Sequence, residues 1–314
     1  MIVRERPSGW RLFFILRGSI APKVAPQVLA ATLVAAVVGR FHGTFFERDL
    51  TFTAAPFTII GLALSIFLGF RNNAAYDRYW EGRRLWGDLG IAGRTLARQA
   101  RSLLAPAGPD AAEEERLRAL RRRMAYKAIA FAHALRHRLR GTDPEEDLRP
   151  LLDGDEPRAV AASQNPPAAV LASLNEELRE CLARRQVEAP LAARIDETIA
   201  ALDRVQAGCE RIRSTPIPFS YTLLLHRTAY LYCFLLPFGL VEAAGMATPV
   251  VVGLVSYTFF GLDALGDEIE EPFGTAPNDL PLSALCRGLE IDLRGALGEA
   301  DLPPPLRPED YASL

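Results

Sequence analysis

Long apolar stretches alternate with highly charged ones along the chain, and four of the apolar stretches have the length of membrane-crossing helices. They cover residues 25–41, 50–70, 219–241 and 246–262. The second carries no charged side chain, and its length is close to the ~20 residues that a helix needs to cross the hydrocarbon core of a bilayer. A buried helix of a soluble protein is the alternative for each stretch, but such a helix usually keeps a polar face. The pattern favours four transmembrane helices.

Polar helices are predicted between and after these stretches. Proline and turn signals divide the polar part into helices at residues 71–104, 110–140, 165–185, 190–213 and 282–297. Asp110, with Glu113 three residues later, is the expected cap of the second of these helices. No segment alternates with a period of two, so no sheet is expected. The tail from Asp301 is expected to be loose.

The fold class predicted from this pattern is an all-α membrane protein with a large helical cytosolic domain. Residues 1–70 hold the N-terminal segment and the first two spans, and residues 71–215 form the cytosolic domain. Residues 216–263 hold the third and fourth spans, and residues 264–314 form a C-terminal helix and tail.

The distribution of positive charge predicts the orientation. Residues 1–23 hold five lysines and arginines and residues 71–215 hold 25, whereas the turn at 242–245 has none. Because positive residues concentrate on the cytosolic side, both termini and the central region are placed in the cytosol. No small-residue cleavage site follows the N-terminal charges, so a signal peptide is not expected. The expected location is the cell inner membrane, with several passes.

Composition argues against several functional classes. The net charge of −2 gives no reason to expect nucleic-acid binding. The four cysteines lie far apart without metal-binding or disulfide spacing. No nucleophile–base pair, HExxH motif or glycine-rich phosphate loop occurs, so neither an enzyme nor a cofactor is indicated. His133 and His137 have a helical spacing that suits metals, but without a nearby carboxylate or cysteine in the sequence a solvated helix face is favoured.

A row of bulky apolar residues follows the second span. Leu62, Ile66 and Phe70 recur every fourth position, beside a face of small residues at 61, 65 and 69 that permits close helix contact. The row can face lipid, or it can form an apolar ring around a symmetry axis that gates by dewetting. Spacing alone does not separate these two interpretations.

The segment directly after this row is rich in arginine, asparagine and tryptophan, as is typical of a desolvated subunit interface. Its candidate interface residues are Arg71, Asn72, Asn73, Tyr76, Asp77, Arg78, Trp80, Arg83 and Trp86. A stripe of leucines on the last helix is a second candidate for contact between subunits, formed by Leu282, Leu285, Leu289, Leu293 and Leu297.

The segment RNNAAYDRYWEGRRLWG at residues 71–87 closely resembles the signature of the bestrophin family in its bacterial form. Further segments agree with the family in order and position: Arg17–Ile20, Ile217–Phe219 with Tyr221 and Thr222, and Gly261–Asp263 leading to Glu271–Gly274. The resemblance covers residues 10–300 and depends on the whole set of motifs, while the stretch from Gly141 to Pro190 does not align.

This resemblance implies a homopentamer around one ion pathway in the lipid bilayer, with small inorganic ions as the permeating species. By position, Leu62, Ile66 and Phe70 correspond to the family's hydrophobic neck. The cytosolic aperture falls near the start of the helix after Pro190, on Ala193 with Leu191 and Ile195 as alternatives. Animal members hold calcium with a run of acids after the Pro-Phe-Gly segment. Here the run at residues 275–279 has one carboxylate, so calcium gating is not expected.

Three functions remain open from the sequence: a passive ion channel, a membrane enzyme or coupled transporter, and a non-conducting scaffold. The resemblance implies chloride conduction and leaves monovalent cations open for a bacterial member, because an apolar neck does not select the sign of the permeating ion's charge. His226 and Arg227 lie inside the third span. Pairing of Arg227 with Asp263 or Glu268 is favoured over a role in permeation.

Overall fold

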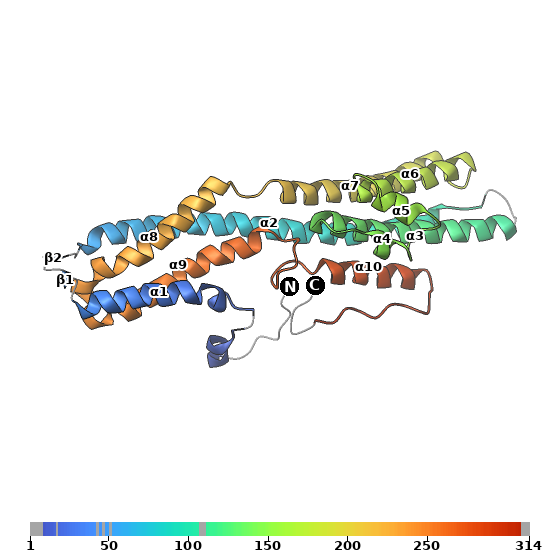
Figure 1. Ribbon diagram of the computed structural model, residues 1–314. Coiled ribbons are helices and arrows are strands. Elements are labelled where there is room, and N and C mark those ends of the chain that lie inside the picture. Colours follow the sequence, from blue (N-terminus) through green and yellow to red (C-terminus); the bar gives the residue numbers. More distant parts are fainter. Residues whose placement is uncertain are drawn as a thin grey trace. The chain divides into compact units, whose positions relative to one another are not determined.

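The computed structural model describes residues 9–16, 18–41, 44–45, 48–49, 52–106 and 111–308, and most of their regular structure is helical (Figure 1). The elements in chain order are η1 (Gly9–Phe14), α1 (Ala21–Arg40), β1 (Thr44–Phe45), β2 (Arg48–Asp49), α2 (Ala54–Leu103), α3 (Ala111–Arg140), α4 (Glu145–Leu148), α5 (Glu156–Ala161), α6 (Pro166–Ala183), α7 (Ala189–Ser214), α8 (Phe219–Ala244), η2 (Gly245–Ala247), α9 (Thr248–Glu270) and α10 (Leu282–Ala296). Strands β1 and β2 have two residues each and pair in an antiparallel arrangement. This pair is the one departure, in the described part of the chain, from the expectation that no sheet would form. The predicted cap Asp110, the first residues of the second apolar stretch and Arg17 lie outside the described residues.

Three helical runs are long and apolar enough to cross a membrane, judged by length and composition. They are Ala21–Arg40, Ala54–Leu103 and Phe219–Glu270. The third run joins α8, η2 and α9, and the chain folds back at Gly245 so that α8 and α9 pack against each other (Figure 1). Gly245 has a φ of +49°, a backbone conformation that glycine adopts without steric cost. The two apolar stretches predicted on either side of this turn therefore correspond to α8 and α9.

Helix ends differ from the prediction where charged or weakly periodic residues decide them. The apolar stretch at 246–262 is expected to end at Leu262, but α9 continues through a charged segment to Glu270. Short helices α4 and α5 have four and six residues, too few to show a helical period, and are not predicted. The segment 71–104 continues the second span without a break in α2 and ends within one residue of its predicted bound, and the other polar helices begin and end within two residues of theirs.

The chain divides into two compact units. We call Arg4–Tyr79 with Pro216–Glu271 the apolar unit, because it holds α1, the first half of α2, α8 and α9. We call Met1–Val3, Trp80–Thr215 and Pro272–Leu314 the polar unit, which holds the rest of α2 and the charged helices.

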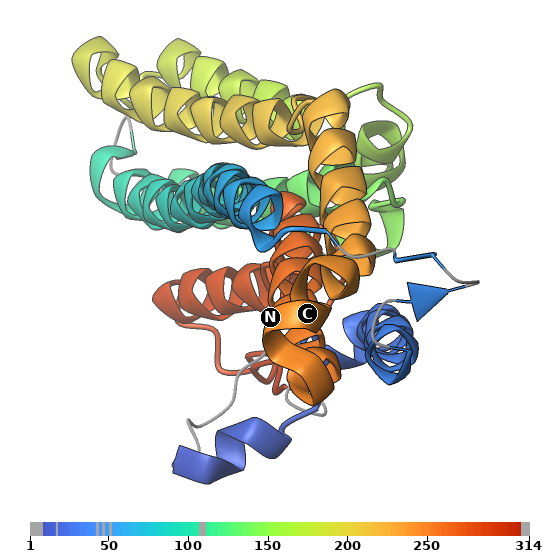
Figure 2. The same ribbon diagram turned by 90° about the vertical axis from the view of Figure 1, so that its left-hand side faces the viewer.

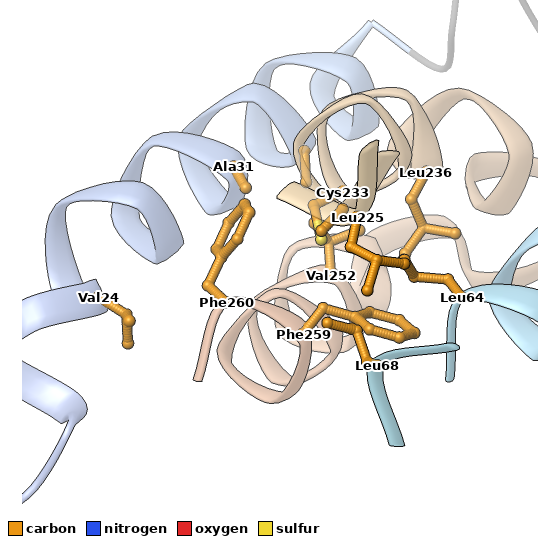
Figure 3. Packing of buried hydrophobic residues seen from close by; sticks show 12 residues of the cluster. Val24, Ala31, Leu64, Leu68, Leu225, Cys233, Leu236, Val252, Phe259 and Phe260 are labelled. Atoms are coloured by element: carbon orange, nitrogen blue, oxygen red, sulfur yellow. The ribbon is translucent and has the colours of Figure 1, made fainter. Parts of the chain in front are cut away.

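The core of the apolar unit is formed where α2 meets α8 and α9. Leu64 and Leu68 of α2 are buried in a cluster with side chains of α1, α8 and α9, among them Leu225, Leu236 and Phe259 (Figure 3). Helix α1 packs against both α9 and α8. Burial of a leucine side chain stabilises a fold by about 1.5–3 kcal/mol in water, and in lipid the gain comes from close packing of helices.

Helix α3 is the central element of the polar unit. Every residue from Met124 to Leu135 is buried, and α6 and α10 pack against this helix. Helices α6 and α7 lie side by side in both views (Figure 1, Figure 2). Four buried residues of α10 mark its inner face: Leu282, Cys286, Leu289 and Leu293.

Three of the five stripe leucines, Leu282, Leu289 and Leu293, are therefore buried inside the subunit, whereas Leu285 and Leu297 keep part of their surface exposed. A Cβ atom added at Gly93 of α2 would lie only 3.3 Å from Cδ1 of Leu289. The high amphipathicity that suggested an interface arises because α10 covers α3 and the adjoining part of α2 within one chain.

A buried arginine joins α2 to α9 in the apolar unit. Arg71 is fully buried and its Nη1 atom lies 2.9 Å from Oδ1 of Asp263 and 3.2 Å from the carbonyl oxygen of the same residue. Its Nη2 donates to Asp267 and lies 3.4 Å from Oε2 of Glu270. The three carboxylates recur at positions i, i+4 and i+7, so they share one face of α9.

Neighbouring polar groups complete this cluster. Asn72 donates to the carbonyl oxygen of Leu262 at 3.1 Å, and Arg78 donates from Nε to the carbonyl oxygen of Glu270 at 3.1 Å. Glu270 also accepts a hydrogen bond of 3.0 Å from the backbone N–H of Ile217. The cluster thus ties the segment that enters α8, the end of α9 and the middle of α2 together.

Replacing Arg71 with alanine is expected to destabilise the apolar unit. Removing one partner of a buried ion pair leaves uncompensated charge, which costs about 3–5 kcal/mol. The midpoint of thermal aggregation of the purified protein in detergent should fall, and less protein should elute as a monodisperse peak.

Arg227→Ala is the matched control, since Arg227 is exposed on α8 and no ion pair with it occurs among the described residues. Equal behaviour of the two variants would show that the Arg71 cluster does not stabilise the fold.

Candidate pore-lining site

The bulky apolar row of α2 lies on the surface of the subunit. Leu62 is 64% exposed, Ile66 47% and Phe70 60%. Leu64 and Leu68 lie two residues to either side of Ile66, about 160° away around the helix, and are buried in the core of the apolar unit. The row therefore points away from the subunit's own core, as both lipid-facing and pore-lining residues would.

The three small residues of α2 at positions 61, 65 and 69 differ in what they contact. A Cβ atom at Gly61 would lie 2.5 Å from the hydroxyl of Tyr232 on α8, so a larger residue at this position would require Tyr232 to shift. Ser65 bonds its own helix, donating to the carbonyl oxygen of Gly61 at 2.8 Å. A Cβ atom at Gly69 would meet nothing within 4 Å. Tyr221 of α8 also donates from its hydroxyl to the carbonyl oxygen of Phe67 at 3.0 Å, so α8 contacts α2 along the length of the row.

The row offers no ionisable or hydrogen-bonding group to a passing ion. Its three side chains are hydrocarbon, so a ring of them would set a barrier by excluding water and would not by itself choose the sign of an ion. Charged groups begin one residue later at Arg71, but this guanidinium is turned inward to α9 and is fully buried. The arginine therefore orients α2 and is not a surface charge next to the row.

Four of the nine candidate interface residues are engaged inside the subunit. Arg71 is buried in the cluster described above, and Trp86 is 4% exposed within the polar unit. Asn72 and Arg78 are half-buried and bond to α9. Contacts within the chain account for the burial of these residues, and sequence composition does not distinguish such an arginine or tryptophan from one that meets a partner.

The remaining candidates lie on the surface of the subunit. Tyr76 and Trp80 are large aromatic side chains with 57% and 49% of their surface exposed. Asn73, Asp77 and Arg83 are also exposed. An exposed aromatic pair at i, i+4 is the part of this segment that still fits an interface with another chain.

The three candidate aperture residues differ in burial. Ala193 is exposed near the start of α7, and Leu191 is half-buried. Ile195 has no exposed surface and packs inside the polar unit. An ion path cannot be lined by a side chain that is buried in the core of its own unit, so the structure removes Ile195 from the set.

The polar residues of the third span pair differently from the prediction. Asp263 pairs with Arg71 and also lies 2.7 Å from Nδ1 of His226. No ion pair with Arg227 occurs among the described residues, so its predicted pairing with Asp263 or Glu268 is wrong. The acids of α9 could have been recognised from the sequence as a charged face, but their partner on α2 lies 192 positions away in the chain.

The pair His133 and His137 does not lie on a solvated face. His133 is buried, and Nε2 of His137 lies 2.7 Å from Oδ2 of Asp147 in α4. Burial lowers the pKa of His137, which favours the neutral ring. Within the described residues no group of three or more His, Cys, Asp or Glu side chains is arranged to hold a metal ion.

The cysteines outside the apolar unit are inert thiols. Burial raises the pKa of Cys181 to about 11 and that of Cys209 and Cys286 to about 12. The nucleophile and metal ligand is the thiolate, which these sites disfavour at neutral pH.

The segment after Pro-Phe-Gly forms a turn closed by its own aspartate. Asp279 accepts a hydrogen bond of 2.7 Å from the backbone N–H of Ala276 and is buried. Its carboxylate therefore serves the local backbone, and the segment offers a calcium ion few free oxygens.

Comparisons with known proteins identify the family of the chain. The family model described as "Bacterial/Fungal Bestrophin protein" matches residues 1–295. A voltage-dependent anion channel-forming protein of Mesorhizobium japonicum is 46% identical over 99% of this chain and 96% of its own length. The voltage-dependent anion channel-forming protein YneE of Escherichia coli is 41% identical over the full length of both chains.

A solved structure shows the same fold. A bacterial bestrophin homologue from Klebsiella pneumoniae with one substitution is 38% identical and superimposes with a TM-score of 0.82, covering 88% of this chain and 100% of that one. The predicted resemblance is therefore confirmed, and the chain belongs to the bestrophin family.

Proposed function

We propose that the chain is one subunit of a bestrophin-type channel that conducts small inorganic ions passively. The observation that carries this proposal is the uncharged row Leu62, Ile66 and Phe70, which is exposed on the face of α2 opposite the subunit core. In a single membrane-spanning subunit such a row would face lipid. Copies arranged around an axis turn it into an apolar constriction.

The names of the relatives favour anions as the permeating ions. Both relatives are described as voltage-dependent anion channel-forming proteins. Family membership and the names of the relatives point to an ion channel and not an enzyme. A non-conducting scaffold is the competing function.

The proposed assembly is a homopentamer in the cell inner membrane, with four spans in each subunit and both termini in the cytosol. Helices α1, α8 and α9 and the apolar half of α2 have the required length and composition. The concentration of lysine and arginine in residues 71–215 supports a cytosolic position for the polar unit. The ion path is proposed to narrow a second time at the cytosolic aperture, at Ala193 or Leu191.

Purified protein in a planar bilayer tests the function directly. We expect ohmic single-channel current without an energy source. Under a potassium chloride gradient its reversal potential should lie on the side of the chloride equilibrium potential. A reversal toward potassium would overturn the anion assignment while leaving the channel intact, and absence of current would favour the scaffold.

Replacing Ile66 with the shorter side chain of alanine should raise the conductance. Ile66→Ala removes apolar carbon from every subunit, so the proposed ring becomes wider and wets more readily. Because Ile66 faces away from the subunit core, folding and assembly should be unaffected.

Ile60→Ala is the matched control for this change. Ile60 is the same residue type, is 44% exposed compared with 47% for Ile66, and lies about 120° away around α2. Its replacement should leave conductance nearly unchanged. If Ile60→Ala raised the current and Ile66→Ala did not, the row would face lipid.

Trp80→Ala should weaken assembly of the pentamer. Truncating an aromatic anchor at an interface can cost about 2 kcal/mol or more. Native mass spectrometry in mild detergent should show five copies for the unaltered protein and smaller species for the variant. Leu182→Ala, another exposed apolar residue of the polar unit, is the control and should remain fully assembled. A monomer or dimer of the unaltered protein would contradict the proposed assembly.

A further inference from the structure

An arginine-lined cleft opens in the polar unit between α2, α3 and α10. Its volume is about 950 Å³, which is within the range of small-molecule sites. Ala97, Leu293, Ala296 and Leu297 contribute apolar surface. Its charged lining consists of five arginines and one acid, namely Arg94, Arg98, Arg101, Arg118, Arg121 and Asp292. A chain whose net charge is −2 thus concentrates positive charge in one cleft.

Part of this charge is neutralised inside the chain. Arg94 lies 2.8 Å from Oδ2 of Asp292, and Arg118 lies 2.8 Å from Oε2 of Glu115. Both pairs are largely exposed, and exposed pairs of this kind contribute about 0–1 kcal/mol, so they can be exchanged for a ligand at little cost.

One arginine is held in place more firmly. Arg121 is 21% exposed and donates from Nη2 to the carbonyl oxygen of Leu104 at 2.6 Å. Its Nη1 lies 3.1 Å from Oε1 of Glu114, and its buried Nε has no hydrogen-bond partner among the described residues. This guanidinium is therefore ordered by the fold before any ligand arrives.

The other two arginines have no acidic partner among the described residues. Within the described part of the chain no carboxylate pairs with Arg98 or Arg101, and Arg101 donates only to the carbonyl oxygen of Ala296 at 3.4 Å. Arg94, Arg98 and Arg101 follow one face of α2 at i, i+4 and i+7. Like charges brought together without counter-charge raise the free energy of the folded state, and an anion bound between them removes that cost.

The geometry points to a binding site for a small molecule that carries two or more phosphate groups. Arginine presents planar pairs of N–H donors that match phosphate oxygens. Arg94 and Arg101 are separated by about 10 Å along α2, at 1.5 Å per residue, so a single phosphate group cannot reach the whole row. An extended polyphosphate can, and the apolar surface on α10 leaves room for an organic group attached to it.

Isothermal titration calorimetry on the full chain in detergent tests this proposal. The probes are inorganic phosphate, inorganic pyrophosphate and ATP. Pyrophosphate and ATP should bind, and inorganic phosphate should bind at least about tenfold more weakly, because each further charged hydrogen bond contributes roughly a factor of ten. Tighter binding of ATP than of pyrophosphate would assign a nucleotide as the ligand source, and equal binding would assign an inorganic polyphosphate.

The double variant Arg98→Ala with Arg101→Ala should lower the affinity for pyrophosphate by about tenfold or more. Arg149→Ala with Arg179→Ala is the control, since it removes two exposed positive charges from the same unit outside the cleft. Equal loss in both variants, or no binding of any probe, would overturn the site. So would a change of oligomeric state in the first variant without a change in affinity, because the cleft would then be a contact between copies.

These measurements do not involve conduction. Failure of the cleft to bind phosphate would leave the proposed channel untouched, and a protein without current could still bind pyrophosphate.

Discussion

The buried guanidinium of Arg71 is the interaction on which the arrangement of the apolar unit depends. It stands one residue after the apolar row and reaches across to Asp263, Asp267 and Glu270 on α9. Burying a charge without partners would be prohibitive, so α2 is held at the rotation that brings Arg71 against α9. Leu64 and Leu68 share that rotation and enter the core. Leu62, Ile66 and Phe70 must then point outward.

The same constraint explains why α9 is longer than its apolar stretch. Its last turns carry acids, which would normally mark the end of a buried helix. Here they are partners of Arg71, and Glu270 also receives hydrogen bonds from Arg78 and from the backbone of Ile217. Polar residues at the end of the apolar unit thus extend the packing of α2, α8 and α9 beyond the length that lipid contact alone would define.

The two units use arginine in different ways. In the apolar unit Arg71 is neutralised by carboxylates and serves only the fold. In the polar unit Arg98 and Arg101 have no carboxylate partner within the described residues and line an open cleft. The two uses differ because of burial. A buried cation requires a partner from its own chain, whereas an exposed cation is solvated by water and remains free to bind a ligand. The polar unit therefore offers a property that the apolar row cannot provide, namely recognition of negative charge.

The sequence by itself determined the apolar spans, most polar helices and the family, because hydrophobic length, helical period and local motifs are properties of neighbouring residues. It also determined that Leu62, Ile66 and Phe70 share a face, since spacing in a helix fixes that relation. Only the tertiary structure decided which way that face turns, because the answer depends on a contact between Arg71 and residues 192 or more positions away. For the same reason only the structure showed that Trp86, Ile195 and three leucines of α10 are buried within their own chain. An amphipathic or aromatic pattern predicts that the apolar face of a helix will be buried. Only the packed fold shows which residues bury it.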